Sequence, residues 1–104
     1  MTEKEYYQYF IDKFGINAQV LMAIEEMSEL SNVLTKYLRF GEDSLDQKYK
    51  ENIIEELADV KNMIGQLSYY FGDNDVAKTQ KEKLERTILR IKEKEHENSN
   101  PKNS

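Results

Sequence analysis

Two acidic stretches, IEEMSEL at residues 24–30 and IIEELADV at residues 53–60, decide the fold that we expect for this chain. In each stretch two acids stand three positions apart among apolar residues: Glu26 with Glu29, and Glu56 with Asp59. Residues three apart on an α-helix lie about 60° apart around its axis, so each pair reaches the same side of a helix. The stretches therefore predict two helices that face each other and bring four carboxylates together.

These acids fit a metal site better than a solvated surface. Like charges at this spacing destabilise a helix unless a cation binds them, and no Lys or Arg stands between Ala18 and Thr35. Partly buried carboxylates have to be paired, protonated or metal-bound. Because the chain has no Cys and its single His is the distant His96, the available ligands are oxygens, which suit Mg²⁺ or Mn²⁺. Glutamates that simply face solvent are the structural alternative.

The composition favours one helical domain. With 104 residues, the chain is close to the size at which oligomerisation often adds to a modest core. It has one Pro, four Gly and little strand-like alternation. The net charge of −5 argues against nucleic acid as the main partner. Since no apolar run approaches the length of a membrane span or of a signal sequence, we expect a cytoplasmic protein that does not enter the membrane.

Capping residues predict four helices. Thr2 and Gly15 bound the first, and Asn17 is the expected N-cap of the second. The second ends at about residue 40, the third runs from about 45, after a capping box at Ser44, to 71, and the fourth from 73 or 74 to about 95. Residues 1–95 are therefore expected to form the helical domain, and residues 96–104 a disordered polar tail.

The third helix carries a regular apolar stripe with a 4-3-4-3-4 spacing, which is typical of a helix packed nearly antiparallel to its neighbours. Its members are Ile53, Leu57, Val60, Ile64, Leu67 and Phe71. We expect this stripe to be the packed seam, with Glu56 and Asp59 at its edge.

Three further polar residues are candidates for contacts to a substrate. Lys36 follows Glu29 by about two turns on nearly the same face, so it could reach the phosphates of a ligand held at the acids. Arg39 lies in the last turn of the same helix. The structural alternative for both cations is a favourable interaction with the negative end of the helix dipole. Asn62 follows Asp59 by one turn and is either a surface amide or a contact to a sugar or phosphate.

The two acidic motifs resemble a known signature. EEMSE followed by EELAD is similar to the EExxE and ExxD motifs of the MazG-like all-α nucleoside triphosphate pyrophosphohydrolases, with likeness from about Phe14 to Phe71. The resemblance implies an all-α bundle of about four helices, completed by oligomerisation into a homodimer or homotetramer. It also implies Mg²⁺-dependent hydrolysis between the α and β phosphates of an NTP or dNTP, which gives the monophosphate and pyrophosphate.

Site residues follow from the same resemblance. Glu26, Glu29, Glu56 and Asp59 match the metal-binding acids, and Glu25 matches the acid that orients the attacking water. The chain departs from dCTP-preferring relatives in having no Trp, so Tyr or Phe would have to line the base, and the base preference stays open. An alternative is a regulatory helical module that binds nucleotide or metal without turnover.

Overall fold

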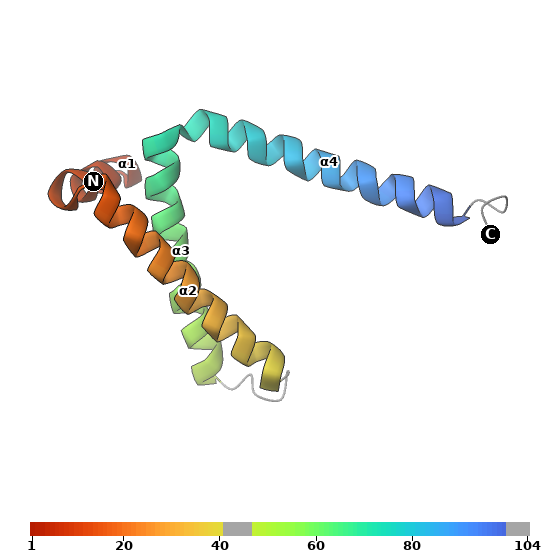
Figure 1. Ribbon diagram of the computed structural model, residues 1–104, viewed down its shortest axis with the longest axis horizontal. Helices are drawn as coiled ribbons and strands as arrows, with labels where there is room; N and C mark the ends of the chain where they lie inside the picture. Colours follow the sequence, from red (N-terminus) through yellow and green to blue (C-terminus); the bar gives the residue numbers. More distant parts are fainter. Residues whose placement is uncertain (41–46, 100–104) are drawn as a thin grey trace. The chain divides into compact units, whose positions relative to one another are not determined.

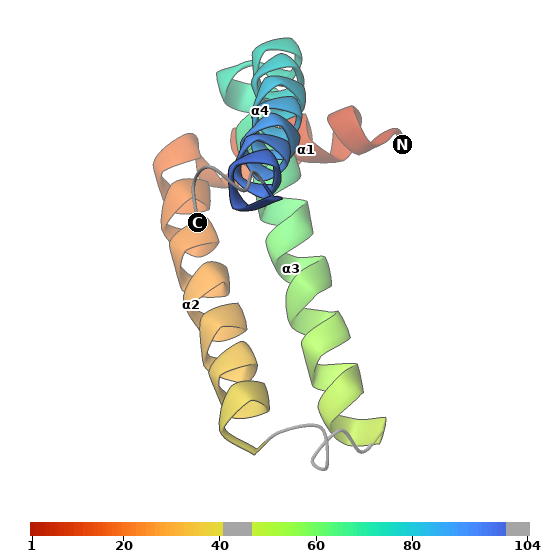
Figure 2. The same ribbon diagram turned by 90° about the vertical axis from the view of Figure 1, so that its right-hand side faces the viewer.

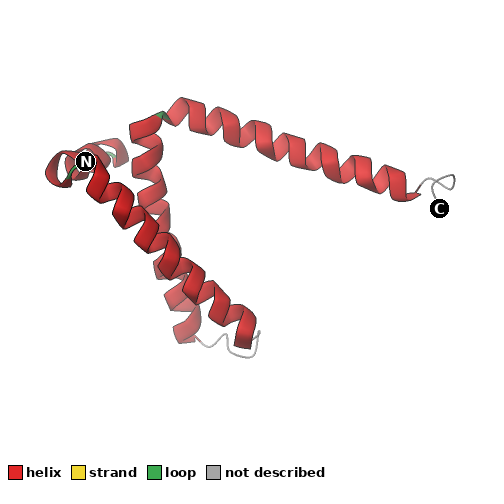
Figure 3. Ribbon diagram, viewed as in Figure 1, coloured by secondary structure: helices red, strands yellow, loops and turns green. Residues whose placement is uncertain are grey.

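The computed structural model describes residues 1–40 and 47–99, and nearly all of them are helical (Figure 3). Four helices follow one another along these residues: α1 at Glu3–Phe14, α2 at Ile16–Phe40, α3 at Gln47–Phe71 and α4 at Asp73–Ser99 (Figure 1). The described part contains no strand, which confirms the all-α prediction. The chain divides into two compact units, Met1–Phe71 and a second that begins at Gly72. None of the described helices is both long and apolar enough to span a membrane.

The boundary between α1 and α2 is a single residue. Thr2 caps α1 as predicted, since its Oγ1 accepts a hydrogen bond of 3.2 Å from the Glu5 N–H. Gly15 ends α1 with a φ of 85°, a conformation that costs little only for glycine. The Gly15 carbonyl then accepts from the Gln19 N–H, so α2 begins at Ile16. The prediction that Asn17 caps α2 is therefore wrong, because the helix already begins one residue earlier.

α2 and α3 pack side by side and antiparallel (Figure 2). Gln19 on α2 faces Gln66 on α3 across a hydrogen bond of 2.8 Å. Seven residues further along α2, Glu26 faces Asp59, which lies seven residues back along α3. Glu29 faces Glu56 at the next turn. These three facing pairs share one register, so the amide pair and both acid pairs are fixed by the same packing.

The packed side of α3 matches the predicted seam only in part. Leu57, Ile64 and Phe71 of that seam are 49%, 46% and 68% exposed in the chain. Met63, only 5% exposed, lies in the core with Ala23 of α2. Ile53, Val60 and Leu67 of the predicted seam are half-buried, so the side of α3 that meets α2 takes in half of that seam together with Met63 and Gln66. Within Met1–Phe71, no other described residue covers the opposite apolar side of the α2–α3 pair.

α1 packs across α2 and α3. On α3, Gly65 makes room for it, because a Cβ at this position would lie only 2.6 Å from Cζ of Tyr7 and would clash with its hydroxyl. The Tyr7 ring also lies 6.2 Å from the ring of Tyr69, whose hydroxyl donates a hydrogen bond of 2.6 Å to Gln8. α1 therefore lies against α3 through aromatic rings that fit over a glycine.

None of the described side chains of α4 is buried. It starts at Asp73, directly after Gly72 with its φ of 139°, and continues four residues beyond the predicted end at residue 95. Its apolar residues Leu84, Ile88 and Ile91 are all about half exposed or more. Residues 96–99, predicted to be part of a disordered tail, are helical, whereas residues 100–104 and the predicted capping box at Ser44 lie outside the described residues.

Candidate functional site

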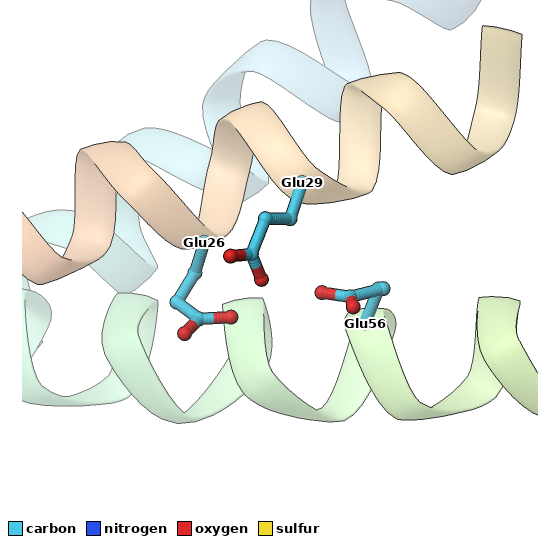
Figure 4. Close-up of side chains that lie close together, drawn as sticks. All are labelled: Glu26, Glu29 and Glu56. Atoms are coloured by element: carbon cyan, nitrogen blue, oxygen red, sulfur yellow. The ribbon is translucent and has the colours of Figure 1, made fainter.

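Three glutamates from two helices converge between α2 and α3. Glu26 and Glu29 extend from α2 towards α3, and Glu56 extends from α3 towards them (Figure 4). One carboxylate oxygen of each lies within 4.8 Å of the other two. Oxygens bound to one octahedral Mg²⁺ lie about 2.9 Å apart when adjacent and about 4.2 Å apart when opposite. Glu26, Glu29 and Glu56 are therefore the residues that would hold a cation at this place.

Asp59 adds a fourth carboxylate to this acid cluster. It lies within hydrogen-bonding reach of Glu26, and its charge acts on both Glu26 and Glu56. Its side chain is exposed, whereas Glu26 and Glu56 are half-buried. The structure thus brings together all four acids that the sequence predicts as metal ligands.

Two oxygens of the acid cluster are buried and have no hydrogen-bond partner among the described residues. These are Oε2 of Glu26 and Oε2 of Glu56. A buried acceptor without a partner is uncommon and costly in a folded protein, so each such group needs a physical explanation. A divalent cation at the cluster would give both oxygens a partner.

The acids also repel one another. Burial raises the pKa of Glu26 above its ordinary value, and the negative charges of Glu29, Asp59 and Glu56 raise it further. The pKa of Glu56 is raised by burial and then by the charges of Glu29 and Asp59. Both raised pKa values mean that the ionised forms of Glu26 and Glu56 are disfavoured in this arrangement. A cation would reverse that penalty, so the donor set fits a hard divalent metal such as Mg²⁺ or Mn²⁺.

The other predicted residues lie at different distances from the acid cluster. Glu25 is exposed and lies about 100° around α2 from Glu26. Lys36 and Arg39 are exposed too, about 10 and 15 Å along the α2 axis beyond Glu29. Asn62 lines a pocket together with Glu26 and Asp59. The structure therefore brings Asn62 to the acids, whereas the two cations lie further along the helix.

The pocket that Asn62 shares with Glu26 and Asp59 has a volume of about 260 Å³ and lies beside the acid cluster. Phe10 and Phe14 contribute to its wall from α1, and two buried amides, Gln19 and Gln66, contribute from α2 and α3. Neither glutamine was predicted from the sequence. Their signal was present, because each stands two helical turns from a predicted metal ligand, but its use requires the register between α2 and α3.

Comparison with known proteins adds no relative. No protein-family model matches the chain, and no curated protein and no solved structure matches it. The interpretation of the site therefore rests on its own geometry.

Proposed function

We propose that the protein is a Mg²⁺-dependent nucleoside triphosphate pyrophosphohydrolase, which cleaves the α–β phosphate bond of an NTP or dNTP. The observation that carries the proposal is the acid cluster: carboxylates from two helices within 4.8 Å of one another, with two buried oxygens that lack a partner. The adjoining pocket supports it, because it offers an apolar, aromatic space next to the acids for the organic part of a ligand.

The chain's own residues divide the work in this proposal. Glu26, Glu29, Glu56 and Asp59 hold the cation, and the packed α2–α3 pair keeps them in place before substrate arrives. The cation supplies charge neutralisation at the phosphates and lowers the pKa of a nearby water. Glu25, next to Glu26 on the exposed side, is our candidate for accepting the proton of the attacking water. Lys36, Arg39 and Asn62 are proposed to contact phosphate or sugar.

Assembly is part of the same proposal. The uncovered apolar residues of α2 and α3 favour a homodimer or homotetramer, in which a second copy covers them. A cytoplasmic location is part of the same proposal. A neighbouring chain could then bring Lys36 or Arg39 of its own α2 to the acids, which would offset the distance between these cations and the acids within one chain.

Pyrophosphate release tests the function directly. The protein is incubated with each natural NTP and dNTP in the presence of Mg²⁺, and pyrophosphate is measured against a chelated sample. We expect turnover of at least one triphosphate, its loss on chelation, and a fall of at least a hundredfold in kcat for Glu29→Gln or Glu56→Gln, because each removes a charged ligand.

Glu85→Gln on α4 is the matched control, since Glu85 is exposed and distant in sequence from both acidic motifs. It should keep wild-type turnover. If Mg²⁺ and nucleotide raise the melting temperature but no triphosphate in the panel is hydrolysed, the protein is instead a binding module of the regulatory kind.

A further inference from the structure

The buried amide pair Gln19–Gln66 is the least expected feature of the α2–α3 packing. Both side chains are 3% exposed, and Gln19 Nε2 donates to Gln66 Oε1 at 2.8 Å. Gln66 Nε2 in turn donates to the Met63 sulfur at 3.7 Å. The thioether accepts but cannot donate, so it fixes which end of the Gln66 amide carries the nitrogen. Gln66 therefore presents its oxygen to Gln19, and the Gln19 amide is oriented by that contact.

This orientation leaves Gln19 Oε1 without a partner. The atom is buried, and it accepts no hydrogen bond within the described part of the protein. An apolar side chain of similar size would fill the same position without this cost. An acceptor that is held in one orientation, buried and unpartnered among the described residues is a candidate to accept a hydrogen bond from a ligand in the adjoining pocket.

Gln19 lines the 260 Å³ pocket beside the acid cluster. Phe10, Phe14 and Met22 supply aromatic and apolar surface there, while Glu26 and Asp59 border the same pocket. Gln19 precedes Glu26 by two helical turns, about 10 Å along α2. The pocket therefore suits a ligand with two parts. A flat apolar part with an N–H group would lie near Gln19, and an anionic, cation-binding part would lie about two helical turns away at the acids.

We propose that Gln19 is the residue that reads the nucleobase: its Oε1 accepts a hydrogen bond from an N–H group on the edge of a base that lies in this pocket. Gln66 is a positioning residue, which acts through the orientation of the Gln19 amide. The inference rests on the proposed function, because it places the triphosphate at the acid cluster and the base at the amide pair. It assigns base selection to an amide oxygen in addition to the aromatic rings.

A kinetic comparison tests the assignment. Gln19→Leu keeps the approximate volume and removes the acceptor, so kcat/KM for the preferred triphosphate should fall about tenfold, mostly through KM, and the preference among bases should flatten. Gln80→Leu, the same change at an exposed site on α4, should leave both unchanged. If Gln19→Leu retains the wild-type order and spread of kcat/KM values across the bases, the assignment is wrong.

A binding experiment separates this inference from the proposed function. Metal-free protein labelled with ¹⁵N is titrated with deoxyuridine, deoxycytidine, deoxyadenosine and deoxyguanosine, which have no phosphate to bind or cleave. We expect at least one nucleoside to shift the side-chain amide signals of Gln19 and Gln66, while the Gln80 signal stays unmoved. Shifted Gln19 signals without any triphosphate turnover would support the base contact and contradict the proposed activity. Turnover with unmoved Gln19 signals would support the activity and contradict the base contact.

Folding of the variants is followed in the same spectra. Should Gln19→Leu not fold because Gln66 loses its donor, Gln19→Met provides a longer and more flexible replacement. If neither folds, the wild-type titration alone decides, since unmoved Gln19 and Gln66 signals at saturating nucleoside overturn the assignment.

Discussion

The carboxyl groups of Glu26 and Glu56 take up protons more readily than ordinary glutamates do. Their pKa values are raised, first by burial and then by the neighbouring carboxylates. An unfolded chain titrates these groups near the ordinary value of 4.5, whereas the folded chain titrates them higher. Between the two values the folded state binds more protons, so the stability that these groups contribute is fully present below about pH 4.5 and is lost as the pH rises through the raised pKa.

A pH series of thermal melts checks this balance. In metal-free buffer, we expect the contribution of the acid cluster to lower Tm as the pH rises from about 5 to about 8. Glu26→Gln removes one of the repelling charges, so it should raise Tm at neutral pH by a few degrees and weaken the pH dependence. Glu85→Gln, on the exposed face of α4, should behave like the wild type.

Mg²⁺ should change the sign of that dependence. Because a cation binds the ionised carboxylates, its stabilising effect grows as the pH rises. Tm measured with millimolar Mg²⁺ should therefore exceed the metal-free value most at high pH, and Glu29→Gln should reduce the difference. An equal Tm with and without Mg²⁺ across the series would contradict Mg²⁺ binding at the acid cluster.

At the scale of the helices, the contact between α1 and α3 depends on Gly65. In the middle of a helix, replacing Gly with Ala normally stabilises a protein by about 1 kcal/mol. Here the added Cβ would run into the Tyr7 ring, so we expect Gly65→Ala to destabilise the protein by about 1 to 3 kcal/mol instead, as overpacking does. Urea unfolding followed by circular dichroism measures the change, and its sign alone distinguishes the two outcomes.

A second substitution tests the cause. In a Tyr7→Leu background the ring is gone, so Gly65→Ala should recover the stabilising effect of alanine in a helix. If Gly65→Ala is equally destabilising with and without the ring, the loss does not come from the α1–α3 contact.

The outcome at the level of helices also shows what the sequence could predict. Helix period and charge alone led to the four acids, because residues three apart share a side of a helix whatever that helix packs against. The Gln19–Gln66 pair and the exposed side of Leu57 and Ile64 could not be found in this way. Both depend on how α3 is rotated and shifted against α2, and that is set by packing between residues far apart in the chain.

The start of α2 shows a second, more local limit of prediction from sequence. Asn17 is a good N-cap in isolation, yet the carbonyl of Gly15 already begins the next helix. A sequence pattern identifies residues that can cap, whereas the turn actually formed selects among them. The closing residues of α4, predicted as tail and found as helix up to Ser99, show the same ambiguity at a helix end.

At the scale of the whole molecule, many large apolar side chains of the described residues are exposed. Only Ala23 and Met63 are fully buried apolar residues in the described part, while Leu21, Ile24 and Ile64 are about half exposed. Small domains with so little core generally rely on partners or on cross-links, and this chain has no Cys. Self-association is the simplest way to cover these residues.

Sedimentation equilibrium tests the assembly. For a chain of 12.3 kDa, we expect a mass of two or four chains at micromolar concentration. Ile64→Gln should shift the equilibrium towards monomer by at least tenfold in the association constant, whereas Lys61→Gln, an exposed polar residue one turn away, should not. A monomer at all concentrations would contradict the expected oligomer.

The common register of the three facing pairs also limits how this chain can diverge. Inserting one residue between Gln19 and Glu26 would turn them by about 100° relative to each other, and no single change on α3 restores both contacts. Point substitutions leave that interval intact, whereas insertions and deletions break it. Sequences that keep these contacts therefore have to preserve the number of residues between the amides and the acids within α2 and α3.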